Sequence, residues 1–165
     1  MTIFIQNVSR SFLAQITRQR TFSPTSGSQH YQDYRDYSMM VHPQVFENPE
    51  VYGLFQDCLN DNVLYYKEAI DTFGVPPEEA RQLLPNACAV NYMVTMDVRN
   101  ILFFLRQRLC HRNVYEMRIF ANRLRDICVT WWPEVFINSG PPCYNGLCNQ
   151  GKIACGRPWR TDEPI

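Results

Sequence analysis

The sequence predicts an α+β fold that is mainly helical, with a small sheet and a core of long helices. Two observations lead to this prediction: a short β-rich run at the N-terminus, and three longer segments in which apolar residues recur every three or four positions. Of the 165 residues, 45% are hydrophobic and 13% aromatic, which suits one domain with a buried core. We expect this domain over residues 1–140 and a tail rich in Cys, Gly and Pro over residues 141–165.

The N-terminal part predicts a strand, a short helix and a loop. Residues 2–5 form the β-rich run, and residues 9–20 contain no Gly or Pro and carry apolar residues four positions apart. Residues 21–43 are rich in Ser, Gly, Gln, Tyr and Asp and follow no period, so we expect a long ordered loop. A loop of that length in a compact domain favours a binding role.

Longer amphipathic patterns predict the helical core. Apolar residues recur with helical spacing over residues 47–73, 94–109 and 114–128. Gly74 ends the first pattern, and a short helix with prolines and acidic residues in its first turn is expected within residues 75–85.

Three charged residues in the last part of this core are spaced four positions apart, as on one helical face: Arg108, Arg112 and Glu116. Such a row is either part of a ligand site or a surface row of ion pairs.

The charge pattern limits the partners. Sixteen Lys plus Arg balance sixteen Asp plus Glu, so no global field attracts nucleic acid or an anionic membrane. No stretch approaches the roughly 18 to 20 apolar residues of a spanning helix, and the N-terminus lacks a leader pattern, so we expect a cytoplasmic protein. Lysine occurs only at Lys67 and Lys152, and the excess of arginine favours forked contacts with phosphate or carboxylate oxygens.

The segment from Arg18 to Tyr31 resembles the signature of flavin-dependent thymidylate synthases. It reads Arg-Gln-Arg-Thr-Phe-Ser-Pro-Thr-Ser-Gly-Ser-Gln-His-Tyr. The family pattern is Arg-His-Arg, two residues, Ser, one residue, Asn-Glu, one residue, Ser, one residue, Arg-Tyr, and the spacing matches without a gap. Two further blocks follow in order: residues 80–85 resemble the family's Ala-Arg-x-x-Leu-Pro stretch, and residues 97–108 resemble its Asn-x-Arg to Leu-x-x-Arg helix.

The resemblance implies a mainly helical α+β subunit that assembles as a homotetramer, with active sites at subunit boundaries. It implies FAD as cofactor, NADPH and methylenetetrahydrofolate as co-substrates, and a one-carbon transfer to C5 of a pyrimidine deoxynucleoside monophosphate, dUMP to dTMP. Because the flavin carries the hydride chemistry, the protein has to orient the reactants and hold anions.

The resemblance also assigns candidate site residues. It implies that four residues bind the flavin: Arg18, Gln19, Arg20 and Arg99. It implies that seven residues bind the nucleotide: Gln15, Arg18, Ser26, Ser28, His30, Arg81 and Arg108. Arg108 is the candidate catalytic residue. Arg99 and Arg108 are nine positions apart, roughly half a turn out of phase on one helix, so they serve two pockets or two subunits.

Departures from the family pattern leave two alternatives open. Gln19 replaces the His of the signature, Thr25 and Ser26 replace its Asn-Glu, His30 replaces its last Arg, and Asp97 replaces the Asn of the helix motif. An exchange of amide for carboxylate changes the hydrogen bonds offered to a base, so one alternative is a dCMP or dUMP methylase or hydroxymethylase of altered specificity. The chain also begins at the strand before the signature, where family members carry a further α/β segment. The second alternative is therefore a non-catalytic nucleotide-binding or assembly subunit.

The tail contains three cysteines interleaved with glycines, as in a turn-rich knuckle: Cys143, Cys148 and Cys155. Structural zinc normally requires four ligands, and a fourth is not evident, although His111 or a neighbouring subunit could supply it. A disulfide or unligated thiols are simpler interpretations, so we predict no metal.

Overall fold

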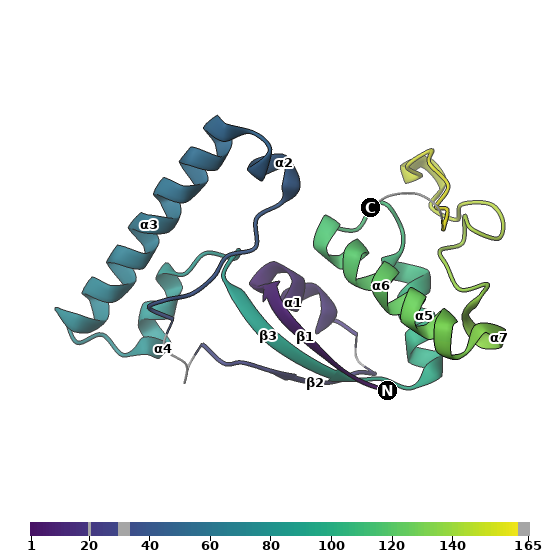
Figure 1. Cartoon of the computed structure of the whole chain (residues 1–165), viewed down its shortest axis with the longest axis horizontal. Coiled ribbons are helices and arrows are strands. Elements are labelled where there is room, and N and C mark those ends of the chain that lie inside the picture. The colour runs from purple at the N-terminus through teal and green to yellow at the C-terminus, as the bar shows by residue number, and fades with distance from the viewer. Residues whose placement is uncertain (20, 30–33, 162–165) are drawn as a thin grey trace. The chain divides into compact units, whose positions relative to one another are not determined.

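The computed structural model describes residues 1–19, 21–29 and 34–161, which divide into two compact units (Figure 1). The first unit is Thr2–Thr95, and the second comprises Met1 and the chain from Met96 onward. The predicted fold class, a mainly helical α+β subunit with a small sheet, is confirmed. Among the described residues, no helix combines the length and the apolar character that crossing a membrane requires.

The sheet of the first unit has three antiparallel strands in the order β1-β3-β2. They are β1 (Thr2–Ser9), β2 (Ser23–Ser26) and β3 (Ala89–Thr95). The central strand β3 alternates between buried and more exposed side chains, the pattern of a sheet with one covered face. A bulge interrupts β1 between Ile5 and Val8, where Asn7 takes a positive φ of 54°.

All three strands correct the sequence prediction. The helical pattern expected over residues 94–109 was wrong at its start, because Val94 belongs to β3 and happens to lie four residues before Val98 of the next helix. The loop expected over residues 21–43 contains β2, which the pattern missed because its four side chains are all exposed and show no apolar alternation. The N-terminal strand extends to Ser9, beyond residue 5.

Helix α1 (Arg10–Ile16) packs against β1 and β3 and buries Phe12, Leu13 and Ile16. It begins at Ser9, whose Oγ accepts a hydrogen bond of 2.9 Å from the backbone N–H of Phe12. It ends at Ile16, earlier than the predicted end near residue 20.

The remaining helices of the first unit are α2 (Pro43–Phe46), α3 (Pro49–Asp71), α4 (Pro77–Ala80) and a 3₁₀ turn η1 (Arg81–Leu83). Gly74 ends α3 as predicted, with φ +65°, while its N–H and that of Val75 donate to the carbonyls of Ile70 and Ala69. Most of α3 stays at the surface, because Tyr66 is the only fully buried side chain on this helix.

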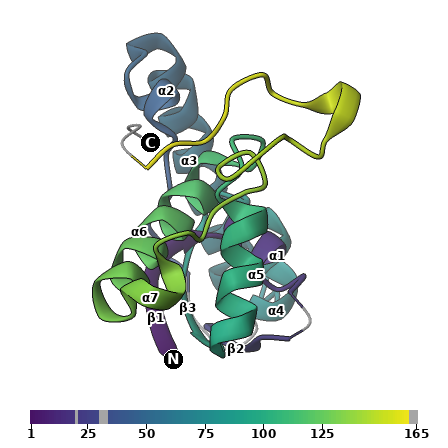
Figure 2. The ribbon, with the colours of Figure 1, turned by 90° about the vertical axis from the view of Figure 1, so that its right-hand side faces the viewer.

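The second unit consists of α5 (Val98–Arg108), α6 (Tyr115–Trp131), α7 (Pro133–Phe136) and the tail, which carries the 3₁₀ turn η2 (Gly151–Ile153). Figure 2 shows α5 and α6 side by side, with the tail running past their ends. The core of this unit is formed by buried side chains of α5, α6 and α7: Ile101, Phe104, Leu105, Met117, Ala121, Leu124, Cys128 and Phe136.

The charged row predicted on one helical face is wrong. Helix α5 ends at Arg108 and α6 begins at Tyr115, so Arg112 lies in the turn between them. The side-chain amide of Asn113 closes this turn by donating to the carbonyls of Gln107 at 2.8 Å and Cys110 at 3.1 Å. The helical spacing of the three charged residues therefore extends across a turn that the side chain of Asn113 stabilises, and it does not mark one helix.

Candidate functional site

A cavity of about 350 Å³ in the first unit brings together three of the predicted nucleotide-binding residues. Ser26 lies at the end of β2, Ser28 lies in the segment that follows, and Arg81 lies where α4 passes into η1. Helix α1 and the residue that follows it complete the cavity with Arg10 and Thr17. The site therefore collects hydroxyl groups and guanidiniums from three parts of the chain.

Backbone hydrogen bonds to the region of β3 fix two of these segments. The N–H of Arg10 donates to the carbonyl of Cys88 at 3.1 Å, which places the start of α1. The N–H of Gly27 donates to the carbonyl of Asn91 at 3.1 Å, which places the segment after β2. Both segments that line the cavity are thus hydrogen-bonded to the central strand or to the residue before it. Their polar side chains therefore extend from ordered backbone.

The electrostatics of this cavity favour an anion. Its described lining contains the two guanidiniums of Arg10 and Arg81 and no carboxylate. Within the described part of the chain, neither guanidinium forms an ion pair. Forked guanidiniums and hydroxyl groups are the donors that bind phosphate oxygens in proteins. The arrangement can therefore hold a phosphate group.

A buried thiol lies next to this cavity and remains neutral. The Nε2 of Gln29, a lining residue, donates to the Sγ of Cys88 at 3.7 Å. Burial raises the pKa of Cys88 to about 11, although the hydrogen bond from Gln29 and the charge of Arg10 act in the opposite direction. Cys88 is therefore a protonated, structural thiol near neutral pH and does not neutralise the guanidiniums.

Three other predicted residues of the first unit lie outside the cavity lining. Gln15 is half-buried on α1, Arg18 is exposed just after this helix, and Gln19 is buried with its N–H bonded to the carbonyl of Ile16. Two predicted residues, Arg20 and His30, fall outside the described residues.

The second unit carries the remaining two predicted residues, both on α5. Arg99 is exposed in the first turn of this helix. Arg108 is half-buried at the last position, and its Nη1 donates to the Oδ1 of Asn113 at 3.2 Å. Because Asn113 also closes the α5–α6 turn, the guanidinium of Arg108 is oriented by the same side chain that shapes the backbone there.

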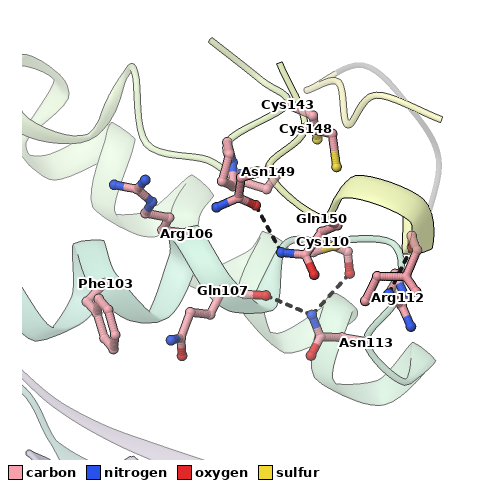
Figure 3. A pocket seen from close by; sticks show the side chains of 13 residues that line it. Phe103, Arg106, Gln107, Cys110, Arg112, Asn113, Cys143, Cys148, Asn149 and Gln150 are labelled. Atoms are coloured by element: carbon pink, nitrogen blue, oxygen red, sulfur yellow. Dashed lines mark hydrogen bonds between the residues drawn. The ribbon is translucent and has the colours of Figure 1, made fainter. Parts of the chain in front are cut away.

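A larger cavity of about 660 Å³ lies between the end of α5 and the tail, and none of the predicted site residues lines it (Figure 3). Arg106 and Arg112 line it together with amide side chains and prolines. The Nη1 of Arg112 is already bonded to the carbonyl of Ile153 at 2.8 Å. In the smaller cavity, by contrast, neither guanidinium forms an ion pair among the described residues.

Three of the lining residues with polar side chains were not singled out as ligands by the sequence prediction: Arg10, Thr17 and Gln29. Arg10, Leu13, Ala14 and Thr17 follow the i, i+3, i+4, i+7 pattern and all line the cavity. This helical spacing could have identified Arg10 and Thr17 from the sequence, whereas no local pattern marks Gln29.

Similarity to known proteins identifies the family of this chain. Residues 1–134 match the family described as "Thymidylate synthase complementing protein". A flavin-dependent thymidylate synthase from Geobacter sulfurreducens is 30% identical over 158 residues, which cover 94% of this chain and 68% of the relative. The chain belongs to the flavin-dependent thymidylate synthase family.

Other members of the flavin-dependent thymidylate synthase family give the same result. The enzyme of Clostridium tetani is 28% identical over 171 residues, covering 94% of this chain and 69% of the relative. A crystal structure of flavin dependent thymidylate synthase ThyX from Helicobacter pylori, complexed with FAD and dUMP, has a TM-score of 0.67 at 16% identity, and covers 84% of this chain and 72% of that one. The family expected from the three sequence blocks is thus confirmed, and so is its fold.

Proposed function

We propose that this chain is an FAD-dependent thymidylate synthase that transfers a one-carbon unit from methylenetetrahydrofolate to C5 of dUMP, with NADPH as reductant and dTMP as product. The observation that supports it is the cavity of about 350 Å³, in which Arg10 and Arg81 stand with Ser26 and Ser28. Members of its family carry the name of this activity, and the Helicobacter pylori relative is described with FAD and dUMP bound.

In this proposal the cavity holds the nucleotide phosphate. Arg10 and Arg81 pair with the phosphate oxygens, and the hydroxyl groups of Ser26 and Ser28 complete the donor set. We also propose Gln15 and His30 as nucleotide-binding residues. Arg108 is the proposed catalytic group, and its hydrogen bond to Asn113 fixes the direction of the guanidinium.

The residues proposed for FAD have the chemistry that a flavin diphosphate requires. Arg18 and Arg99 are exposed, and no carboxylate among the described residues forms an ion pair with either one. We propose that Arg18, Gln19, Arg20 and Arg99 hold the cofactor. When bound, the flavin supplies the redox chemistry of the transfer, and the side chains named here bind and orient the reactants.

We further propose a homotetramer, in which the proposed FAD and nucleotide residues of different subunits complete each active site. Helix α3 supports this assembly because it presents large apolar side chains to solvent, with Leu54 72% and Leu64 57% exposed. We also propose a cytoplasmic location, since every cysteine is a free thiol in the described structure, as a reducing compartment maintains it.

The decisive experiment is an FAD titration of the purified chain, followed by absorbance, with and without dUMP or dCMP. We expect micromolar binding of FAD and a spectral change on addition of dUMP. After methylenetetrahydrofolate and NADPH are added, we expect a product whose mass corresponds to dTMP. A spectral response to dCMP, or a product heavier by one oxygen atom, would instead identify the altered-specificity enzyme suggested by Asp97 and His30. A chain that binds no FAD would be the non-catalytic nucleotide-binding or assembly subunit.

A further inference from the structure

Four of the seven cysteines of the chain line one cavity of about 200 Å³ in the second unit. Cys110 comes from the turn after α5, and the tail supplies Cys143, Cys148 and Cys155. Figure 3 shows Cys143 and Cys148 next to each other above the turn that carries Cys110. The fold thus provides the fourth thiol that the tail sequence alone lacks, from a position more than thirty residues upstream.

Two of these thiols have backbone hydrogen-bond partners: Cys143 accepts from an N–H, and Cys155 donates to the carbonyl of Arg157 at 3.3 Å. The backbone N–H of Trp159 donates to the Sγ of Cys143 at 3.5 Å, a bond that stabilises negative charge on sulfur. Arg112 and Arg157 also line this cavity, and the Nη1 of Arg112 donates to the carbonyl of Ile153. Because four thiolates around a divalent ion leave a net charge of −2, this pair of cations offsets the charge of such a centre.

The backbone beside one of these ligands is uncrowded. Gly156, directly after Cys155, has φ +72°, and nothing lies within 4 Å of the position its Cβ would take. The tail around it is a short 3₁₀ turn and irregular chain, in which Cys148 and Cys155 are exposed. No three metal-binding side chains of the described residues yet lie close enough to hold an ion. Closure of the tail loops over the cavity is the movement that binding requires.

We propose that Cys110, Cys143, Cys148 and Cys155 bind one Zn²⁺ ion as a structural site that fastens the tail to the α5–α6 turn. Four thiols and Zn²⁺ give a tetrahedral tetrathiolate centre and four released protons, with no change of oxidation state. The hydrogen bond from Arg112 to the carbonyl of Ile153 joins the same two segments, and the metal strengthens that connection.

The test is the metal content of the full-length chain, purified under reducing conditions and dialysed without chelator, together with its absorption after replacement of zinc by Co²⁺. We expect one zinc per chain and the intense visible bands of tetrahedral cobalt with thiolate ligands. Cys148→Ser and Cys155→Ser should each lose the metal or reduce its affinity at least tenfold. The matched control is Cys58→Ser, since Cys58 is an exposed cysteine on α3 outside the cavity, and this variant should keep the full content.

Three results would overturn the proposal. One is a reduced wild-type chain that contains no zinc and gives no cobalt–thiolate spectrum. Another is a metal content that the cavity variants leave unchanged. A third is a mass deficit showing that these four cysteines form disulfides in the isolated protein. The cobalt spectrum is measured on the wild-type chain, so the test holds even where a variant fails to fold.

Discussion

The guanidinium carbon of Arg125 lies 5.3 Å from the centroid of the Trp159 ring, so a side chain of α6 holds the tail by a cation–π contact. Arg125 is buried, and its Nε and Nη2 donate to the carbonyls of Ser139 and Ile137, each at 2.8 Å. The Tyr144 ring, 5.0 Å from that of Trp159, lies 5.7 Å from the same guanidinium carbon. One arginine therefore organises both the chain after α7 and the tail.

Arg125→Leu should lower the free energy of unfolding by about 2 to 4 kcal/mol, because it leaves buried carbonyl groups without donors and removes the cation from two rings. Arg125→Lys should lose most of this stability as well, since an ammonium cannot reproduce the planar fork. Urea denaturation followed by tryptophan fluorescence measures the change. The control is Arg123→Leu, which changes an exposed neighbour on the same helix. If Arg123→Leu lost as much unfolding free energy as Arg125→Leu, the stabilising role given to the contacts of Arg125 would be wrong.

Substitution of Arg10 should weaken nucleotide binding, although only the structure singles this residue out. We expect Arg10→Ala and Arg81→Ala each to raise the Kd for dUMP roughly 10-fold to 100-fold, the effect of losing one charge-assisted hydrogen-bonding partner of the phosphate. Deoxyuridine, which lacks the phosphate, should bind the variants and the wild type alike. Calorimetric titration with both ligands separates the phosphate contribution from the base.

The controls for that experiment are Ser11→Ala and Gln82→Ala, which alter exposed neighbours that do not line the cavity. Both should bind dUMP as the wild type does. A parallel loss of affinity for deoxyuridine in Arg10→Ala would show that the substitution damages α1 and not a phosphate contact.

The site and the fold were predictable to different degrees, for physical reasons. Gly74 has a backbone conformation that favours glycine, and its place at the end of α3 followed from the sequence. Ser26 and Arg81 were singled out by their place in a motif, and the structure brings both to one cavity. Strand β2 did not follow from the sequence, because a strand with four exposed polar side chains gains its order from pairing with β3. The cavity role of Gln29 depends on Cys88, 59 positions away, and no local pattern encodes such a contact.

The pH dependence of stability should reveal the buried thiol of Cys88. Its pKa is raised by burial to about 11, so the folded state keeps a proton that the unfolded state releases at lower pH. The stabilisation is complete below the unfolded pKa near 9 and is lost as the pH rises towards about 11. Burial also raises the pKa of Tyr37, to about 12, which acts in the same direction at higher pH.

In Cys88→Ala, the decline of unfolding free energy between about pH 9 and pH 11 should become shallower, because one group that binds a proton in the folded state is gone. Urea denaturation at several pH values measures the slopes. Cys58→Ala, which removes an exposed thiol, should leave the slope as in the wild type. An identical slope in Cys88→Ala would show that Cys88 does not titrate differently in the two states.

Arg108 should be required for turnover more than for cofactor binding. Arg108→Lys keeps the charge but loses the planar fork, so we expect kcat/KM to fall roughly 100-fold while the Kd for FAD stays within a factor of about two. Asn113→Ala should reduce kcat as well, because it releases the guanidinium that its Oδ1 holds at 3.2 Å. Arg106→Lys, on the exposed side of the same helix, should keep wild-type rates. Normal turnover in Arg108→Lys would exclude the catalytic role.

Asp97 tests the alternative of altered base preference. Its Oδ1 accepts from the backbone N–H of Asn100 and its Oδ2 accepts from the side-chain amide of the same residue, both at 2.8 Å, so the carboxylate serves as the N-cap of α5. Asparagine caps helices as well as aspartate, whereas alanine in this place costs about 1 kcal/mol of stability. We therefore expect Asp97→Asn to keep both stability and the ratio of kcat/KM for dUMP and dCMP, and Asp97→Ala to lower the Tm. A shift of that ratio towards dUMP in Asp97→Asn would show instead that the carboxylate reads the base, and the altered-specificity enzyme would then be the better assignment.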